Sequence, residues 1–213
     1  MKYEFVADDL LVFGTHKLTR VRALVDFADV KRGDIGGYVE FAHNLSQEGC
    51  AWLYDKATAM EDDRVTGDAQ VRGESMVYGQ ALVTDQSRVE GSVWVYGNSL
   101  VCEQAHLCDE ACISGYAVLV GRARMEKSSR AFGNAVLGGR VVLTENARMF
   151  CNARAFGASR IAGNVWVRED VCVYGATSLE GDVKYIGTQR LCRGTALFAA
   201  SVDETAGEGL TAT

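Results

Sequence analysis

Four residues near the middle of the chain have the types and the spacing of a zinc site. They follow the pattern C-x3-H-x-C-x3-C and are Cys102, His106, Cys108 and Cys112. Zinc takes thiolate and imidazole ligands in a tetrahedron, each about 2.0–2.3 Å from the ion. The surrounding sequence alternates with a period of two, which puts all four residues on outward positions of an extended coil. We expect the coil to spread them over three faces, so we predict outward thiols and no metal site.

The histidines are the candidates for a general base, and the chain has three, His16, His43 and His106. A general base must lie within hydrogen-bond reach of the proton that it removes. Only His106 falls in the repeated part of the chain, and no Ser-His-Asp, GxxxxGK[ST] or GxGxxG signal accompanies it. A lone outward histidine is usually solvated. We therefore predict no catalytic residue and no cofactor.

Arginine is concentrated in one part of the chain. Residues 121–168 hold eight Arg and one Lys against two Glu, a net charge of +7, so the rest carries −13 of the total −6. Arginine binds phosphate and carboxylate in a bidentate manner. Two interpretations stay open: an anion site for a nucleotide, nucleic acid or acidic protein, or a solvated surface balanced by acids of a partner subunit. The predicted anion-binding residues are Arg122, Arg124, Arg140 and Arg160 on one face and Arg130 and Arg148 on another.

The overall composition excludes several classes of protein. The net charge of −6 argues against a general binder of nucleic acid or anionic membranes, although the Arg-rich region is a local exception. No apolar run approaches the roughly 18 residues of a membrane span. The N-terminus lacks the features of a signal peptide. The seven cysteines, an odd number, then favour free thiols in a reducing cytoplasm.

The elements that position these residues follow from an internal repeat. From Gly49 the chain divides into 25 consecutive hexapeptides, ending at residue 198, and it contains no proline. The first position is mostly Gly, the third is small except at Asp63 and Gln189, and the fifth is always apolar. Alternation predicts strands whose third and fifth positions face inward, and Gly at the first position predicts a bend. Three bends close a triangular coil of 18 residues, so we predict an all-β, single-stranded β-helix of about 8–9 coils.

The two ends of the chain depart from the repeat. We expect residues 1–36 to form a cap that covers the first coil, because an open coil exposes a sheet edge, and we expect a strand at 17–24 within it. Residues 37–42 have the phase of the hexapeptides, so the β-helix is predicted over 37–198. Residues 199–213 are small and polar and are expected to form a tail.

Three stretches carry a resemblance to a known family. They are KLTRVRALVDFADVKRGDIGGYVE, NLSQEGCAWLYDKA, and repeats such as VYGNSLV and VTGDAQVRG. The layout resembles the YdcK-like family of bacterial and prophage-encoded proteins from about residue 16 to the end of the repeats. The resemblance implies a left-handed β-helix, as in hexapeptide-repeat acyltransferases, and a phage or prophage setting, but no established reaction. The repeats depart from those of its relatives at 103–114 and 127–156.

Adding 18 to a residue number moves one coil along the same face, which turns the sequence into a map of the surface. The map predicts an apolar stripe on consecutive coils, larger than a monomer usually exposes. Its sixth-position members are Tyr78, Tyr96, Phe132 and Phe150, interrupted by Ser114, and its fourth-position members are Leu82, Leu100, Val118 and Val136. We interpret the stripe as the interface of a homo-oligomer, either a trimer or a dimer.

Three functional classes remain from the sequence. The favoured one is a non-catalytic, rigid, oligomeric β-helix that binds a host macromolecule, such as a defence component in the phage setting that the resemblance implies. The second is an acyltransferase-like enzyme that uses coenzyme A at a subunit interface. The third is a binder that sequesters a small anionic metabolite such as a nucleotide.

Overall fold

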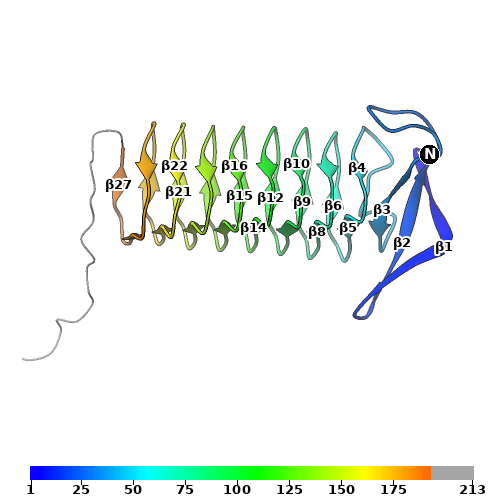
Figure 1. The fold of residues 1–213 in the computed structure, drawn as a ribbon, viewed down its shortest axis with the longest axis horizontal. Coiled ribbons are helices and arrows are strands. Elements are labelled where there is room, and N and C mark those ends of the chain that lie inside the picture. Colours follow the sequence, from blue (N-terminus) through cyan, green and yellow to red (C-terminus); the bar gives the residue numbers. More distant parts are fainter. Residues whose placement is uncertain (193–213) are drawn as a thin grey trace, which may run out of the picture.

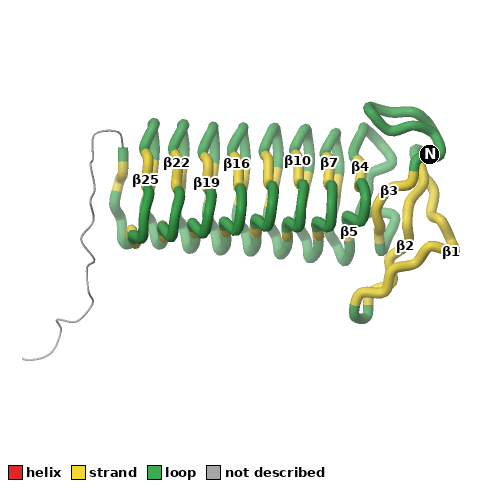
Figure 2. The backbone as a smooth tube through the Cα atoms, in the orientation of Figure 1, coloured by secondary structure: helices red, strands yellow, loops and turns green. Residues whose placement is uncertain are grey.

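The chain folds into a long prism of β-strands with a small β-sheet cap at its N-terminal end (Figure 1). The computed structural model describes residues 1–192, and these contain strands, turns and loops but no helix (Figure 2). The predictions for residues 193–198 and for the tail at 199–213 lie outside this range. The all-β solenoid expected from the repeat is confirmed, with about nine turns whose arrangement is consistent with left-handed coils.

Two-residue strands stack into three parallel sheets, which form the sides of the prism. Side 1 consists of β4 (Trp52–Leu53), β7 (Gln70–Val71), β10 (Arg88–Val89), β13 (His106–Leu107), β16 (Arg124–Met125), β19 (Val142–Leu143), β22 (Arg160–Ile161) and β25 (Ser178–Leu179). Side 2 consists of β5 (Thr58–Ala59), β8 (Met76–Val77), β11 (Trp94–Val95), β14 (Cys112–Ile113), β17 (Arg130–Ala131), β20 (Arg148–Met149), β23 (Trp166–Val167) and β26 (Lys184–Tyr185). Side 3 consists of β6 (Arg64–Val65), β9 (Leu82–Val83), β12 (Leu100–Val101), β15 (Val118–Leu119), β18 (Val136–Leu137), β21 (Arg154–Ala155), β24 (Cys172–Val173) and β27 (Arg190–Leu191).

The register confirms the coil of 18 residues. His106 pairs with Arg88 on one side and with Arg124 on the other, so each residue lies beside its equivalents 18 positions away. Backbone amides donate to carbonyls of the next coil, as Leu100 N does to Ala117 O at 3.0 Å. This continuous ladder explains the absence of proline, which has no amide hydrogen to donate.

The corners of the prism explain the glycines. Gly115, at the first position of its hexapeptide, has a φ of 69°. A Cβ atom at this residue would lie 2.9 Å from the backbone nitrogen of Gly133 in the next coil. Asp85 and Glu103 adopt the same left-handed φ, at 59° and 61°, so the corner geometry is imposed by the coil whatever residue occupies it.

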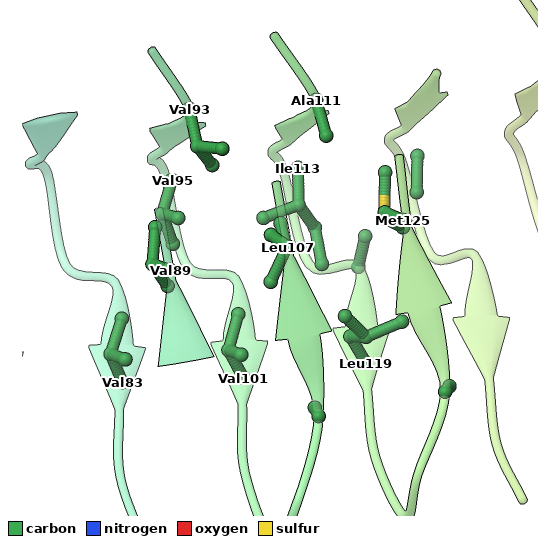
Figure 3. Packing of buried hydrophobic residues seen from close by; sticks show 14 of the residues in the cluster. Val83, Val89, Val93, Val95, Val101, Leu107, Ala111, Ile113, Leu119 and Met125 are labelled. Atoms are coloured by element: carbon green, nitrogen blue, oxygen red, sulfur yellow. The ribbon is translucent and has the colours of Figure 1, made fainter. Parts of the chain in front are cut away.

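The interior is a dry column of aliphatic side chains. Val71, Val89 and Leu107 are fully buried, as the alternation predicts. Each coil balances its third positions against its fifth positions: the coil with the large Leu107, Ile113 and Leu119 carries only alanine at its third positions (Figure 3). The interior therefore holds a similar volume at each level.

The cap is a three-stranded antiparallel arrangement of β1 (Tyr3–Phe13), β2 (His16–Ala23) and β3 (Ile35–Val39). The strand predicted at 17–24 is confirmed by β2, whereas β1 was not predicted. β3 also pairs in parallel with β5, so the cap and side 2 form one sheet. Lys2 closes the open end of the first coil, because its Nζ donates to Ala51 O at 2.8 Å, and burial lowers the pKa of this amine to about 8.

The predicted phase of residues 37–42 is wrong by two positions. Tyr38 pairs with Thr58, and Leu45 bridges to Val65, so the first coil has 20 residues at these points instead of 18. The regular spacing begins where Trp52 pairs with Gln70.

The two additional residues lie in the turn at 46–50, and they serve the cap. Gln47 Oε1 accepts from the backbone nitrogen of Lys2 at 2.7 Å, and Gln47 Nε2 donates to Tyr3 O at 3.2 Å. The side chain of Gln47 thereby acts as a partner for the beginning of β1.

Candidate functional site

The residues of the predicted apolar stripe form two columns on different sides of the prism. Tyr78 stacks on Tyr96 with 4.9 Å between ring centroids, and Phe132 stacks on Phe150 at 4.8 Å. These rings follow strands of side 2, whereas the column of Leu82, Leu100, Val118 and Val136 belongs to strands of side 3. A corner of the prism separates the columns, so they do not form one flat surface.

Side 3 is the flatter and larger apolar surface. Its four middle coils, residues 79–84, 97–102, 115–120 and 133–138, contain no charged residue. Val120, Tyr116 and Phe156 extend this surface beyond the predicted column, and Tyr116 is 64% exposed. The ring of Phe156 lies over Gly138, where a Cβ atom would come within 2.9 Å of it. We call residues 79–84, 97–102, 115–120 and 133–138 the uncharged face.

The predicted anion-binding arginines are also divided between two sides. Arg124 and Arg160 lie on strands of side 1, where they pair with Glu126 at 3.1 Å and with Glu180 at 3.6 Å.

Arg130 and Arg148 are adjacent in the register of side 2, and the guanidinium of Arg148 lies 5.3 Å from the centroid of the Trp166 ring. Arg122 and Arg140 occupy the second position of their hexapeptides, just before strands of side 1. The six arginines therefore do not make a single site.

A different set of basic residues meets on side 1. Six residues of three consecutive coils line an open groove with a volume of about 490 Å³; they are Gln86, Arg88, Gln104, His106, Arg122 and Arg124. Sequence reasoning missed the contribution of Arg88 and His106, although their spacing of 18 from Arg124 was a usable signal. We call this cavity the arginine groove.

A second groove of about 680 Å³ adjoins the arginine groove along the corner of the prism. It shares Gln86, Gln104 and Arg122 with the arginine groove and is otherwise lined by Gly67, Asp68, Asp85, Glu103 and Gly121. One wall of the combined cavity is therefore acidic, and the other is basic. We call this second cavity the acidic groove.

The zinc-like residues lie on all three sides of the prism. Cys102 follows β12 of side 3, His106 begins β13 of side 1 and Cys112 begins β14 of side 2. Burial raises the pKa of Cys108 to about 11, and it raises the pKa values of Cys102 and Cys112 as well, so these thiols are protonated at neutral pH. Within residues 1–192, no group of three or more His, Cys, Asp or Glu residues is placed to hold a metal ion.

The three histidines each have a polar partner. His16 Nδ1 lies 3.0 Å from a carboxylate oxygen of Glu40 in the cap. His43 Nε2 lies 3.0 Å from Glu61 O at the first corner. His106 Nε2 donates to the carboxylate of Glu90, which orients its ring on the surface of side 1.

The described part of the chain contains no helix of the length and apolarity needed to cross a membrane. A scan against protein-family models finds no match to this chain, and a search of the curated proteins finds none either.

Proposed function

We propose that the protein is a non-catalytic β-helix scaffold that self-associates through its uncharged face and presents its other surfaces to a macromolecular partner. The observation that carries this proposal is the uncharged face itself. Charged residues are depleted in the cores of protein interfaces, whereas they dominate ordinary surfaces. Four consecutive coils without a charge, in a chain of net charge −6, mark such a core.

The dimensions of the uncharged face suit the centre of an interface. Four coils at about 4.8 Å and five residues at about 3.3 Å give a surface of roughly 19 by 16 Å. Charged residues border it at both ends, with Arg64 in the coil before and Arg154 in the coil after. An uncharged centre with a charged rim is the usual anatomy of a protein interface.

A second copy of the chain is the occupant that we propose. A second copy brings an equally uncharged surface, so the contact desolvates no unpaired charge. The ladder of hydrogen bonds between coils keeps each prism rigid, so little conformational entropy is lost on association. The assembly is a dimer or a trimer.

The further setting extends the same proposal. In the phage context that the YdcK-like resemblance implies, the partner is a host macromolecule, such as a defence component, in the bacterial cytoplasm. The free thiols of Cys50, Cys102 and Cys108 suit a reducing compartment. The acyltransferase alternative stays a prediction, and binding of acetyl-coenzyme A would support it.

Sedimentation velocity tests the self-association. We expect the wild-type protein to sediment as an oligomer and a variant with Leu100→Glu and Val118→Glu to sediment as a monomer, because two buried carboxylates per copy would face each other across the contact. The matched control carries Gln70→Glu and Val142→Glu at the same outward strand position of side 1, and it should remain oligomeric. A monomeric wild-type protein, or an unchanged sedimentation coefficient of the Leu100/Val118 variant, would contradict the proposal.

A further inference from the structure

The arginine groove collects positive charge on one surface. Arg88, His106 and Arg124 occupy equivalent positions of three successive strands on side 1, β10, β13 and β16. Arg122 lies beside Arg124 on the same coil. The six residues that line the groove include three arginines and no carboxylate. The groove therefore carries a surplus of positive charge on a chain that is acidic overall.

Neighbouring side chains hold two of these guanidinium groups in place. Arg122 Nε donates to Gln104 Oε1 at 2.8 Å, and Gln104 Nε2 donates in turn to Gln86 Oε1 at 3.5 Å. Arg124 Nε lies 3.1 Å from Glu126 Oε1. Both arginines are thus fixed through Nε, and within residues 1–192 their terminal nitrogens make no hydrogen bond to another side chain. Terminal guanidinium nitrogens are the donors that bind phosphate in a bidentate manner.

Arg88 completes the groove without a partner of its own. Its side chain is exposed and makes no hydrogen bond or ion pair with another side chain of the described range. The nearest acid on its coil, Glu90, accepts a hydrogen bond from His106. Arg88 and Arg124 are two coils apart, about 10 Å at the usual spacing of strands. This distance suits a chain of phosphates better than a single one.

The acidic groove gives the ligand a second end. Gln86, Gln104 and Arg122 belong to both grooves, so one molecule can occupy both. Asp85 and Glu103 lie opposite the arginines, and carboxylates accept hydrogen bonds from hydroxyl groups, as the acidic residue does for ribose in dinucleotide-binding folds. A ligand that fits both walls carries phosphates at one end and hydroxyl groups at the other.

We propose that side 1 carries a binding site for a small phosphorylated, hydroxyl-bearing molecule of the nucleoside polyphosphate class. Arg88, Arg122 and Arg124 bind the phosphates, and Asp85 and Glu103 accept hydrogen bonds from the sugar hydroxyls. The site binds its ligand without making or breaking a bond. It lies on a different side of the prism from the uncharged face, so it goes beyond the scaffold function and stands independently of it.

Calorimetric titration with two probes, adenosine triphosphate and inorganic tripolyphosphate, tests the site. The wild-type protein should bind both, and added salt should weaken both. A variant with Arg88→Gln and Arg124→Gln should bind both at least about 100-fold more weakly, because each lost charged hydrogen bond costs about tenfold or more. The control variant, with Arg130→Gln and Arg148→Gln on side 2, should bind both within about twofold of wild type.

A second variant separates the two ends of the ligand. Asp85→Asn with Glu103→Gln should weaken binding of adenosine triphosphate about tenfold relative to tripolyphosphate, because only the nucleotide carries hydroxyl groups. Circular dichroism of every variant checks that the β-helix is folded. The Leu100→Glu and Val118→Glu variant should bind adenosine triphosphate like wild type, so failure of the scaffold function does not affect this test.

Three results would overturn the proposal. The first is a wild-type protein that binds neither probe. The second is equal loss of binding in the variants of side 1 and side 2. The third is a single-stranded oligonucleotide that binds more than about tenfold more tightly than adenosine triphosphate, because this would assign the arginines to a nucleic acid.

Discussion

Asp63 is a buried carboxyl group at a position that the repeat reserves for small side chains. It is fully buried inside the first regular coil, where Asn44 Nδ2 donates to its Oδ1. Its Oδ2 is buried and has no hydrogen-bond partner. Burial raises the pKa of Asp63 well above its usual range, the charges of Glu61 and Glu40 add to this shift, and the hydrogen bond from Asn44 opposes it.

This raised pKa predicts a dependence of stability on pH. The unfolded chain loses the Asp63 proton near the ordinary pKa of about 3.9, whereas the folded chain keeps it to higher pH. The free energy of unfolding should therefore fall as pH rises from about 4 to the folded pKa and stay low above it, by about 1.4 kcal/mol for each unit of the shift. Asp63→Asn should remove this fall and be more stable than wild type at neutral pH, as measured by urea unfolding from pH 4 to 8.

The neighbouring exposed residue Asp62 provides the control for this experiment. Asp62→Asn should leave the pH profile of unfolding as it is in wild type, since Asp62 is exposed on the surface. If the Asp63→Asn variant keeps the wild-type profile, Asp63 is not the group responsible.

At the scale of the coil, stability rests on a balance between the third and fifth positions. Ala111 and Val93 occupy equivalent third positions of side 2 in successive coils. The coil of Ala111 contains Ile113 and two leucines, whereas the coil of Val93 contains three valines at its fifth positions (Figure 3). The smaller third-position residue therefore accompanies the larger fifth-position residues.

Ala111→Val should overpack its coil. We expect the free energy of unfolding to fall by about 1–3 kcal/mol, because the interior has no room for two further carbon atoms. Adding Ile113→Val to the same variant should restore part of the loss by removing one carbon atom from the same level. Urea unfolding of the single and double variants measures both effects, and a double variant no more stable than the single one would exclude this volume balance.

The whole molecule is a stack in which each coil contacts only its neighbours. The strands of each side pair in order along the prism, as β9, β12, β15 and β18 do on side 3. Such a structure behaves as a sum of repeat and nearest-neighbour terms. It follows that complete coils can be removed, whereas the phase of the hexapeptides cannot be changed.

Deletion of residues 97–114, one complete coil, should leave a folded protein. Tyr96 would then precede Gly115, which has the same corner geometry as Gly97. We expect a β-sheet circular dichroism spectrum and a cooperative thermal transition at a lower temperature than in wild type, since one layer of core is lost. Deletion of residues 97–101 should instead aggregate, because a shift by an odd number reverses the inward and outward positions. Similar behaviour of the two deletions would contradict this account of the stack.

The sequence alone determined the interior and the columns of the prism. Alternation separates inward from outward positions, and a closed coil of 18 residues leaves no freedom in which residues stack, as Leu100 on Val118 illustrates. The stripe of Tyr78 and Leu82 was read from the same map, but the map gives only the order of positions around the coil. The corner between them became apparent only when the sides were assembled.

The tertiary structure decided what depends on contacts distant in sequence or on the direction of side chains. The lengthened first coil follows from the pairing of Gln47 with Lys2, which no local pattern encodes. The arginine groove depends on where Gln104 and Glu126 hold Arg122 and Arg124. A long side chain reaches several neighbours from one backbone position, so periodicity fixes where it starts, and only packing fixes where its charge lies.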